Sequence, residues 1–243
     1  MAPYKKTYKP RRRYAKKSTK ASPMKKQVRS IVRTELKKNV EVKYVEQHSN
    51  EKTLNVLGSA LVINMSNIDE GTGPFQRIGK KVRCIGLHVK GIVNNNFAQT
   101  NFVRFALLQS KDQNPIDTTK LLFSSKGPTT GDATLPDLSG GYAGGTILSG
   151  LDTIYYKLSD AKVNVLKQWV IRIGAGNDPS GKGAIMYNHF VKRKMDMIYN
   201  DTTGTSALKP IYLVIWTADA NDDGPVGALV EVNQLATTYY TDA

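Results

Sequence analysis

In the stretch Lys81-Val82-Arg83-Cys84-Ile85-Gly86-Leu87, the basic residues Lys81 and Arg83 alternate with the apolar residues Val82 and Cys84. A period of two places successive side chains on opposite faces of an extended strand. The alternation therefore predicts a β-strand with one face in a core. Cys84, the one cysteine of the chain, falls on the apolar side, so we expect a buried small side chain there rather than a nucleophile.

The same period extends over most of the chain, from Asn39 onward. Runs of β-branched and aromatic residues are divided there by clusters of Gly, Pro, Asn and Asp, and no segment of helical period has comparable length. Parallel strands need long crossover connections, usually helices, and because the sequence predicts none we do not expect a parallel sheet. The sequence predicts an all-β fold, an antiparallel single jelly roll or eight-stranded sandwich. The candidate strands are residues 40–47, 60–65, 80–94, 102–110, 153–158, 169–174, 189–199, 210–218 and 228–235.

Charge is concentrated upstream of these strands. Residues 1–44 contain sixteen Lys and Arg against Glu35 and Glu41, a net charge of +14, whereas the remaining residues contain 19 basic and 18 acidic side chains. A block of like charge repels itself and is stabilised when a polyanion neutralises it. The partner is expected to be nucleic acid, an anionic membrane surface or an acidic protein.

The basic segment divides into two parts. Residues 1–22 have almost no aliphatic side chains, which predicts disorder in the free protein. Ser22-Pro23 then offers an N-cap and a first-turn proline, and apolar residues follow at helical spacing, so an amphipathic helix is expected over about 23–38. We predict two domains, a basic N-terminal arm (residues 1–39) and a jelly-roll domain (residues 40–243). The apolar stripe of the helix lacks Trp and Phe, which disfavours membrane binding.

The arm is the predicted nucleic-acid-binding site. Its cations neutralise phosphates and release counterions, and the interleaved Tyr4, Tyr8 and Tyr14 can stack on unpaired bases. The same basic clusters fit a nuclear-import signal, which makes host import machinery a second expected partner. The candidate binding residues are Lys5, Lys6, Lys9, Arg11, Arg12, Arg13, Lys16, Lys17, Lys20, Lys25, Lys26, Arg29 and Arg33. Secondary candidates follow the arm, at Arg77, Lys80, Lys81 and Arg83.

Three weaker patterns do not favour an enzyme, a cofactor or a metal. Residues 176–183 approach a P-loop but lack its hydroxyl and a following helix. Residues 219–224 resemble the start of a calcium-binding loop, here between strands. Whether an ion binds near Asp219 to Asp223 is an open question. His48, His88 and His189 lack a second ligand at metal spacing. The longest apolar run, residues 211–216, is too short to span a membrane, and no apolar signal core follows the basic start, so no membrane insertion or secretion is expected.

A resemblance to a known family rests on residues 67–91, NIDEGTGPFQRIGKKVRCIGLHVKG. A Gly-rich turn, then Gln76-Arg77-Ile78-Gly79, then a long basic and apolar alternation resembles the capsid proteins of circovirus-like viruses with small circular single-stranded DNA genomes. The resemblance implies a subunit of an icosahedral T=1 shell of about sixty copies, whose arms together bring about 840 positive charges to the genome. It implies location in the virion and the host nucleus. A satellite-type RNA virus coat protein and a non-capsid protein that binds single strands remain alternatives.

Overall fold

The computed structural model describes residues 23–38, 41–55, 60–96, 98–111, 154, 157–158, 160, 163–175, 183–200, 207–219 and 229–242. Within these residues lie one helix and eight strands. They are α1 (Pro23–Lys38), β1 (Lys43–Asn55), β2 (Ala60–Asn64), β3 (Lys81–Asn95), β4 (Asn101–Ser110), β5 (Val163–Ile173), β6 (Ala184–Ile198), β7 (Ile211–Asp219) and β8 (Leu229–Asp242).

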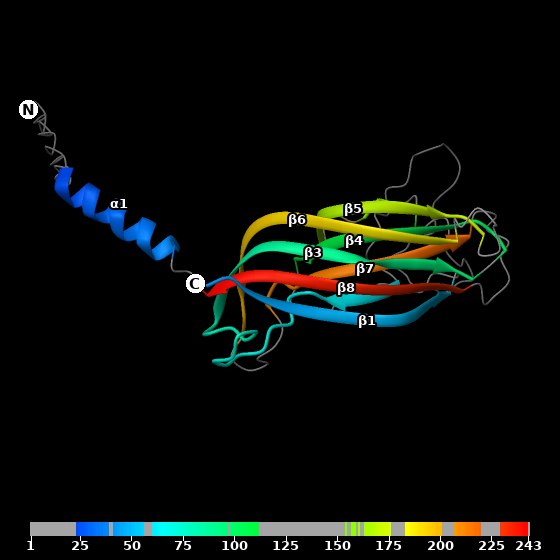
Figure 1. Cartoon of the computed structure of the whole chain (residues 1–243), viewed down its shortest axis with the longest axis horizontal. Coiled ribbons are helices and arrows are strands. Elements are labelled where there is room, and N and C mark those ends of the chain that lie inside the picture. Colours follow the sequence, from blue (N-terminus) through cyan, green and yellow to red (C-terminus); the bar gives the residue numbers. More distant parts are fainter. Residues whose placement is uncertain are drawn as a thin grey trace, which may run out of the picture. The chain divides into compact units, whose positions relative to one another are not determined.

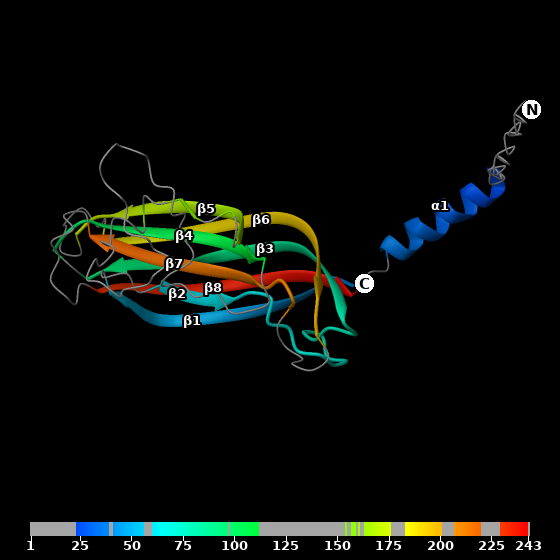
Figure 2. The ribbon, with the colours of Figure 1, turned by 180° about the vertical axis from the view of Figure 1, so that it is seen from behind.

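The strands form two four-stranded sheets. The first sheet has the order β1-β8-β3-β6 and the second β2-β7-β4-β5, and every pairing between named strands is antiparallel. Figures 1 and 2 view the two packed sheets from opposite sides. This order is that of a jelly roll, in which the chain passes repeatedly from one sheet to the other. The predicted fold class, an antiparallel jelly roll with one short helix, is confirmed.

The core lies between the sheets and follows the alternation read in the sequence. In β3 the side chains of Val82, Cys84, Leu87 and Val89 are all fully buried. The alternation shifts by one residue between Cys84 and Gly86, because a β-bulge interrupts the register there. Cys84 is a free, buried thiol, as predicted, and desolvation raises its pKa to about 11. A thiol that stays protonated near neutral pH is a poor nucleophile.

The central strands of the second sheet, β4 and β7, are buried on both faces. The outer face of this sheet carries a second apolar cluster, formed by Ala106, Leu108, Leu158, Val163, Tyr212, Val214 and Trp216. Arg104 is buried on that face, where its guanidinium donates hydrogen bonds to Gln168 Oε1 (2.9 Å) and to the carbonyl oxygen of Ile154 (3.4 Å). Ile154 and Leu158 therefore lie on the outer face of the second sheet.

One candidate strand is wrong and several have different ends. Of residues 153–158, the structure describes Ile154, Lys157 and Leu158, and none of them belongs to a named strand. Leu158 packs into the apolar cluster on the outer face of the second sheet. β5 begins at Val163, before the predicted start at residue 169. The first part of the strand was not predicted because a bulge opposite Leu107 and Leu108 disrupts its alternation. β1, β6 and β8 also extend beyond the predicted ranges 40–47, 189–199 and 228–235.

The chain divides into two units, Met1–Val40 and Glu41–Ala243. In the first unit the structure describes α1, which coincides with the predicted helix. In the second it describes the eight strands and some of the residues between them. No helix in the described part of the chain combines the length and apolar character needed to cross a bilayer.

Candidate nucleic-acid interface

Only part of the predicted binding arm lies within the described residues. The nine cations from Lys5 to Lys20 lie outside them and remain predictions. Lys25, Lys26, Arg29 and Arg33 belong to α1, and the exposed side chains of Lys26 and Arg29 are available to a ligand. The apolar residues of the helix are exposed as well, with Met24, Val28, Ile31 and Val32 at least half accessible.

The charge pattern of α1 disfavours helix formation by this segment when no ligand is bound. Lys25, Arg29, Arg33 and Lys37 follow one another at intervals of four, and the first turn contains no acidic residue. Like charges at this interval destabilise a helix by about 0.2–0.5 kcal/mol per pair, and cations near the N-terminus oppose the helix dipole. A 16-residue helix is already marginal in water. A bound polyanion would remove both penalties.

We therefore expect nucleic acid to increase the helicity of this segment. A peptide spanning residues 20–40 should gain helical circular dichroism when titrated with single-stranded oligonucleotide, and lose the gain at high salt. Arg29→Glu is a matched control, because it converts two repulsive pairs into attractive ones. That variant should be more helical alone and respond less to the oligonucleotide. An oligonucleotide that leaves the helicity of the wild-type peptide unchanged would contradict the expectation.

Arg77 is a structural residue rather than a phosphate ligand. Its side chain is only 1% exposed, so the prediction that it contacts nucleic acid is wrong. The guanidinium donates hydrogen bonds to the carbonyl oxygens of Ile68 (3.2 Å) and Gly79, pairs with Glu70 (3.1 Å) and lies 4.2 Å from the ring centre of Tyr199. The loop that precedes β3 is thus folded around Arg77.

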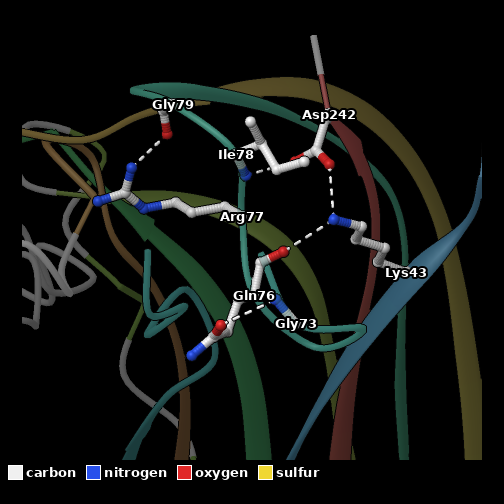
Figure 3. A network of polar contacts seen from close by, with 7 residues as sticks. All are labelled: Lys43, Gly73, Gln76, Arg77, Ile78, Gly79 and Asp242. Carbon is white, nitrogen blue, oxygen red and sulfur yellow. Dashed lines mark hydrogen bonds and ion pairs between the residues drawn. The ribbon is translucent and has the colours of Figure 1, made fainter. Parts of the chain in front are cut away.

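The neighbouring loop residues join this loop to the ends of two strands (Figure 3). Lys43 Nζ at the start of β1 lies 3.0 Å from the carbonyl oxygen of Gln76 and 2.8 Å from Asp242 Oδ2 at the end of β8. The other carboxylate oxygen of Asp242 accepts a hydrogen bond from the Ile78 amide (2.9 Å). Gly79 has φ +81°, a conformation that favours glycine. The Gln76-to-Gly79 motif therefore has a structural explanation.

The other secondary candidates lie on or near the outer face of the first sheet. Lys80 is exposed just before β3. Lys81 forms an ion pair with Asp196 (2.8 Å), and the hydrogen bond from Lys81 lowers the pKa of that carboxyl. Arg83 is exposed and pairs across β3 and β6 with Asp196. Lys81 and Arg83 thus both lie beside the carboxylate of Asp196.

Two further cations on this face were missed in the sequence. Lys90 in β3 and Lys192 in β6 are exposed, and the strand register places them on the same face as Arg83. Lys192 is hard to assign from sequence because it starts the run Lys192-Arg193-Lys194, which shows no alternation. The bulge between Cys84 and Gly86 of β3 falls opposite this run. The register therefore locates a basic surface that the spacing alone does not predict.

The three histidines have separate environments. His48 lies 3.7 Å from Glu46 on the exposed face of β1, and the Nε2 atom of His88 lies 2.7 Å from Asn188 Oδ1. His189 packs against the ring of Trp169 at 4.4 Å, where burial and the charge of Lys167 lower its pKa. The described part of the chain contains no group of three or more His, Cys, Asp or Glu side chains placed to hold a metal ion.

The two loop motifs fall largely outside the described residues. After the P-loop-like residues 176–183, the chain continues as strand β6 rather than as the helix that a phosphate loop requires. Asp219 ends β7, and β8 follows from Leu229, so strands flank the acidic loop as predicted. Residues 220–228, which include most of the possible ion-binding loop, lie outside the described residues.

No family model and no curated protein matches the sequence. Solved structures give distant likenesses. The structure of infectious bursal disease virus, Gx strain, is 9% identical with a TM-score of 0.33, and covers 83% of this chain and 32% of its own. The T13 viral particle of that virus gives 8% identity and a TM-score of 0.27 over 82% and 31% of the two chains. VP1 of Trichodysplasia spinulosa-associated polyomavirus is 12% identical with a TM-score of 0.22, and the match covers 84% of this chain and 97% of the VP1 chain.

This chain spans about a third of the length of the bursal disease virus chains it matches. Scores this low carry no inference about its activity. Function has to be argued from its own fold and charge.

Proposed function

We propose that this chain is a viral capsid protein. Its jelly-roll domain self-associates into a small icosahedral shell of about sixty subunits, and its basic arm packages single-stranded DNA. The observation that carries the proposal is the union of a complete eight-stranded jelly roll with a segment of net charge +14. The protein is structural rather than catalytic in this proposal, and it resides in the virion and the host nucleus.

The distribution of charge supports these separate roles of the jelly-roll domain and the arm. Residues 45–243 carry 19 basic and 18 acidic side chains, so the domains of neighbouring subunits would repel one another little. The arm supplies the phosphate-neutralising charge instead. An interaction through backbone phosphates reads no sequence, which suits a protein that must cover a whole genome.

A satellite-type RNA virus coat protein remains the second candidate, because a polycationic arm neutralises RNA and DNA alike. A third is a non-capsid protein that coats single strands without forming a shell. The basic clusters also suit recognition by nuclear-import machinery, and that role is compatible with packaging.

We expect the full chain, expressed alone, to form closed particles of uniform size that contain nucleic acid. Negative-stain electron microscopy of the purified protein, followed by digestion of the extracted cargo with DNase or RNase, measures both properties. High salt should release the cargo, because counterions compete for the phosphates. Protein that stays monomeric with and without single strands, over a range of ionic strength, would refute the capsid proposal. Beads along a strand without closed shells would favour the third candidate.

A further inference from the structure

We infer that a row of aromatic side chains on the outer face of the first sheet is a base-stacking site for single-stranded nucleic acid. The row contains Phe75, Tyr44, Tyr239, Phe190 and His88, from the loop before β3 and from all four strands of the sheet. The inference rests on the single-stranded cargo of the proposed function, but it places a binding site in the jelly-roll domain rather than in the arm.

The rings form an unbroken path in which Phe75, Tyr44 and Phe190 are exposed and Tyr239 and His88 are half-buried. Successive ring centres are 5.1, 6.3, 6.1 and 6.1 Å apart, and the rings are tilted or edge-on to one another rather than stacked. Phe75, Tyr44 and Phe190 are 51%, 39% and 55% exposed. Aromatic rings with accessible faces stack on bases of any sequence.

Gly86 makes the path continuous. Phe190 on β6 and Tyr239 on β8 are separated by β3, and strands two apart in a sheet lie about 10 Å from each other. The ring of Phe190 reaches Tyr239 by leaning over β3 at Gly86, where an added Cβ would lie 2.5 Å from Phe190 Cζ. A residue with a side chain at this position would push the ring away.

Charge on this face favours a polyanion over other occupants. Arg83, Lys90 and Lys192 are exposed in or beside the ladders that hold the rings, against Glu46, Asp196 and the half-buried Glu231 near the start of β8, and Asp196 is paired with Lys81. A second copy of the same face, or the basic helix α1, would bring cations to cations. The outer face of the second sheet, by contrast, is covered over β4 and β7 by the chain's own apolar cluster.

The row continues into a shallow groove of about 540 Å³ on the same sheet, lined by His48, Lys90, Met186, Asn188 and Leu235 among others. Asn188 links the two, since its side chain contacts His88 at the end of the row. Amide and imidazole groups beside an aromatic ring can hydrogen-bond base edges, and Lys90 can contact a phosphate.

The test compares two polyanions on the full-length protein. Phe190→Ala should bind an oligothymidylate of about twenty nucleotides roughly 10-fold more weakly, while its affinity for inorganic polyphosphate, which has no bases, stays unchanged. Gly86→Ala keeps the ring but displaces it, and should weaken oligothymidylate binding in the same selective way. Ile198→Ala is the matched control, because Ile198 is an exposed apolar residue of β6 that belongs to no ring contact.

Photocrosslinking with oligonucleotides that contain 5-iodouracil should attach bases to peptides carrying Phe190 or Tyr239. Oligothymidylate affinities that match wild type in both variants would overturn the inference and leave the proposed function standing. It would also be overturned if Phe190→Ala changes the oligomeric state without nucleic acid, since the row would then be a contact between subunits. A wild-type chain that binds neither polyanion would refute the proposed function itself.

Discussion

Replacing the nine cations from Lys5 to Lys20 with glutamine is expected to abolish nucleic-acid retention. These residues supply more than half of the +14 charge of the first 44 residues. For single strands each phosphate contact contributes about 0.7 to the slope of log affinity against log salt, so the slope should fall by up to about 6. At physiological salt we expect affinity to fall by about 10³-fold or more. Oligonucleotide titrations at several salt concentrations measure both quantities.

Folding of the jelly-roll domain should survive this change, because the described strands begin at Lys43 and their core residues all lie beyond it. An unchanged thermal transition of the glutamine variant checks this. A matched control replaces Lys90, Lys192 and Lys194 with glutamine, and should lower the slope by only about 2. If the arm variant keeps the wild-type slope, the main phosphate contacts lie in the domain and the assigned role of the arm is wrong.

Arg77→Ala should produce the largest loss of stability among the described charged residues. The substitution leaves the carbonyl oxygens of Ile68 and Gly79 without their donor, removes the stacking on Tyr199 and opens a cavity. Buried groups that lose a hydrogen-bond partner cost about 1–3 kcal/mol each. We expect the free energy of unfolding to fall by about 3–5 kcal/mol, measured by urea denaturation of the unassembled protein.

Arg77→Lys provides the graded comparison. Lysine keeps the charge beside Glu70 but cannot reproduce the planar fork of donors, so it should recover only part of the loss. Arg83→Ala, at an exposed position of β3, should change stability by less than about 0.5 kcal/mol. A loss below about 1 kcal/mol in Arg77→Ala would show that the loop does not depend on this guanidinium.

The fold class could be predicted because alternation is a local property. Residues 80–94 show it directly, whereas residues 210–218 form a short run of β-branched and aromatic residues, and both ranges agree with β3 and β7 to within one residue at each end. The failures have physical causes. In β5 and β3 a bulge shifts the alternation by one residue, and in β6 Ile185-Met186-Tyr187 is apolar throughout although Met186 is 79% exposed. Residues 153–158 look like a strand by composition, but strand pairing depends on distant residues that a local reading lacks.

The candidate site was predictable only where charge density determines it. Sixteen cations in 44 residues indicate a polyanion partner without any structure. The role of Arg77 was not predictable, because nothing near it in sequence shows that its guanidinium lies over Tyr199, more than a hundred positions later. The aromatic row was also hidden, since its members come from five separate segments that only the register of the first sheet brings together.

The two sheets differ in how freely they can change over evolution. Strands β4 and β7 lie between two apolar layers, and the described side chains of Ile211 through Ala218 are all buried. A charged replacement in that octapeptide would place its charge among buried side chains on one face of the sheet or the other. The first sheet requires apolar residues only at alternate positions. Its other positions face outward, where only binding partners constrain the residue type. Outside the aromatic row, sequence changes should therefore accumulate on the outer face of the first sheet, while β4 and β7 keep their apolar composition.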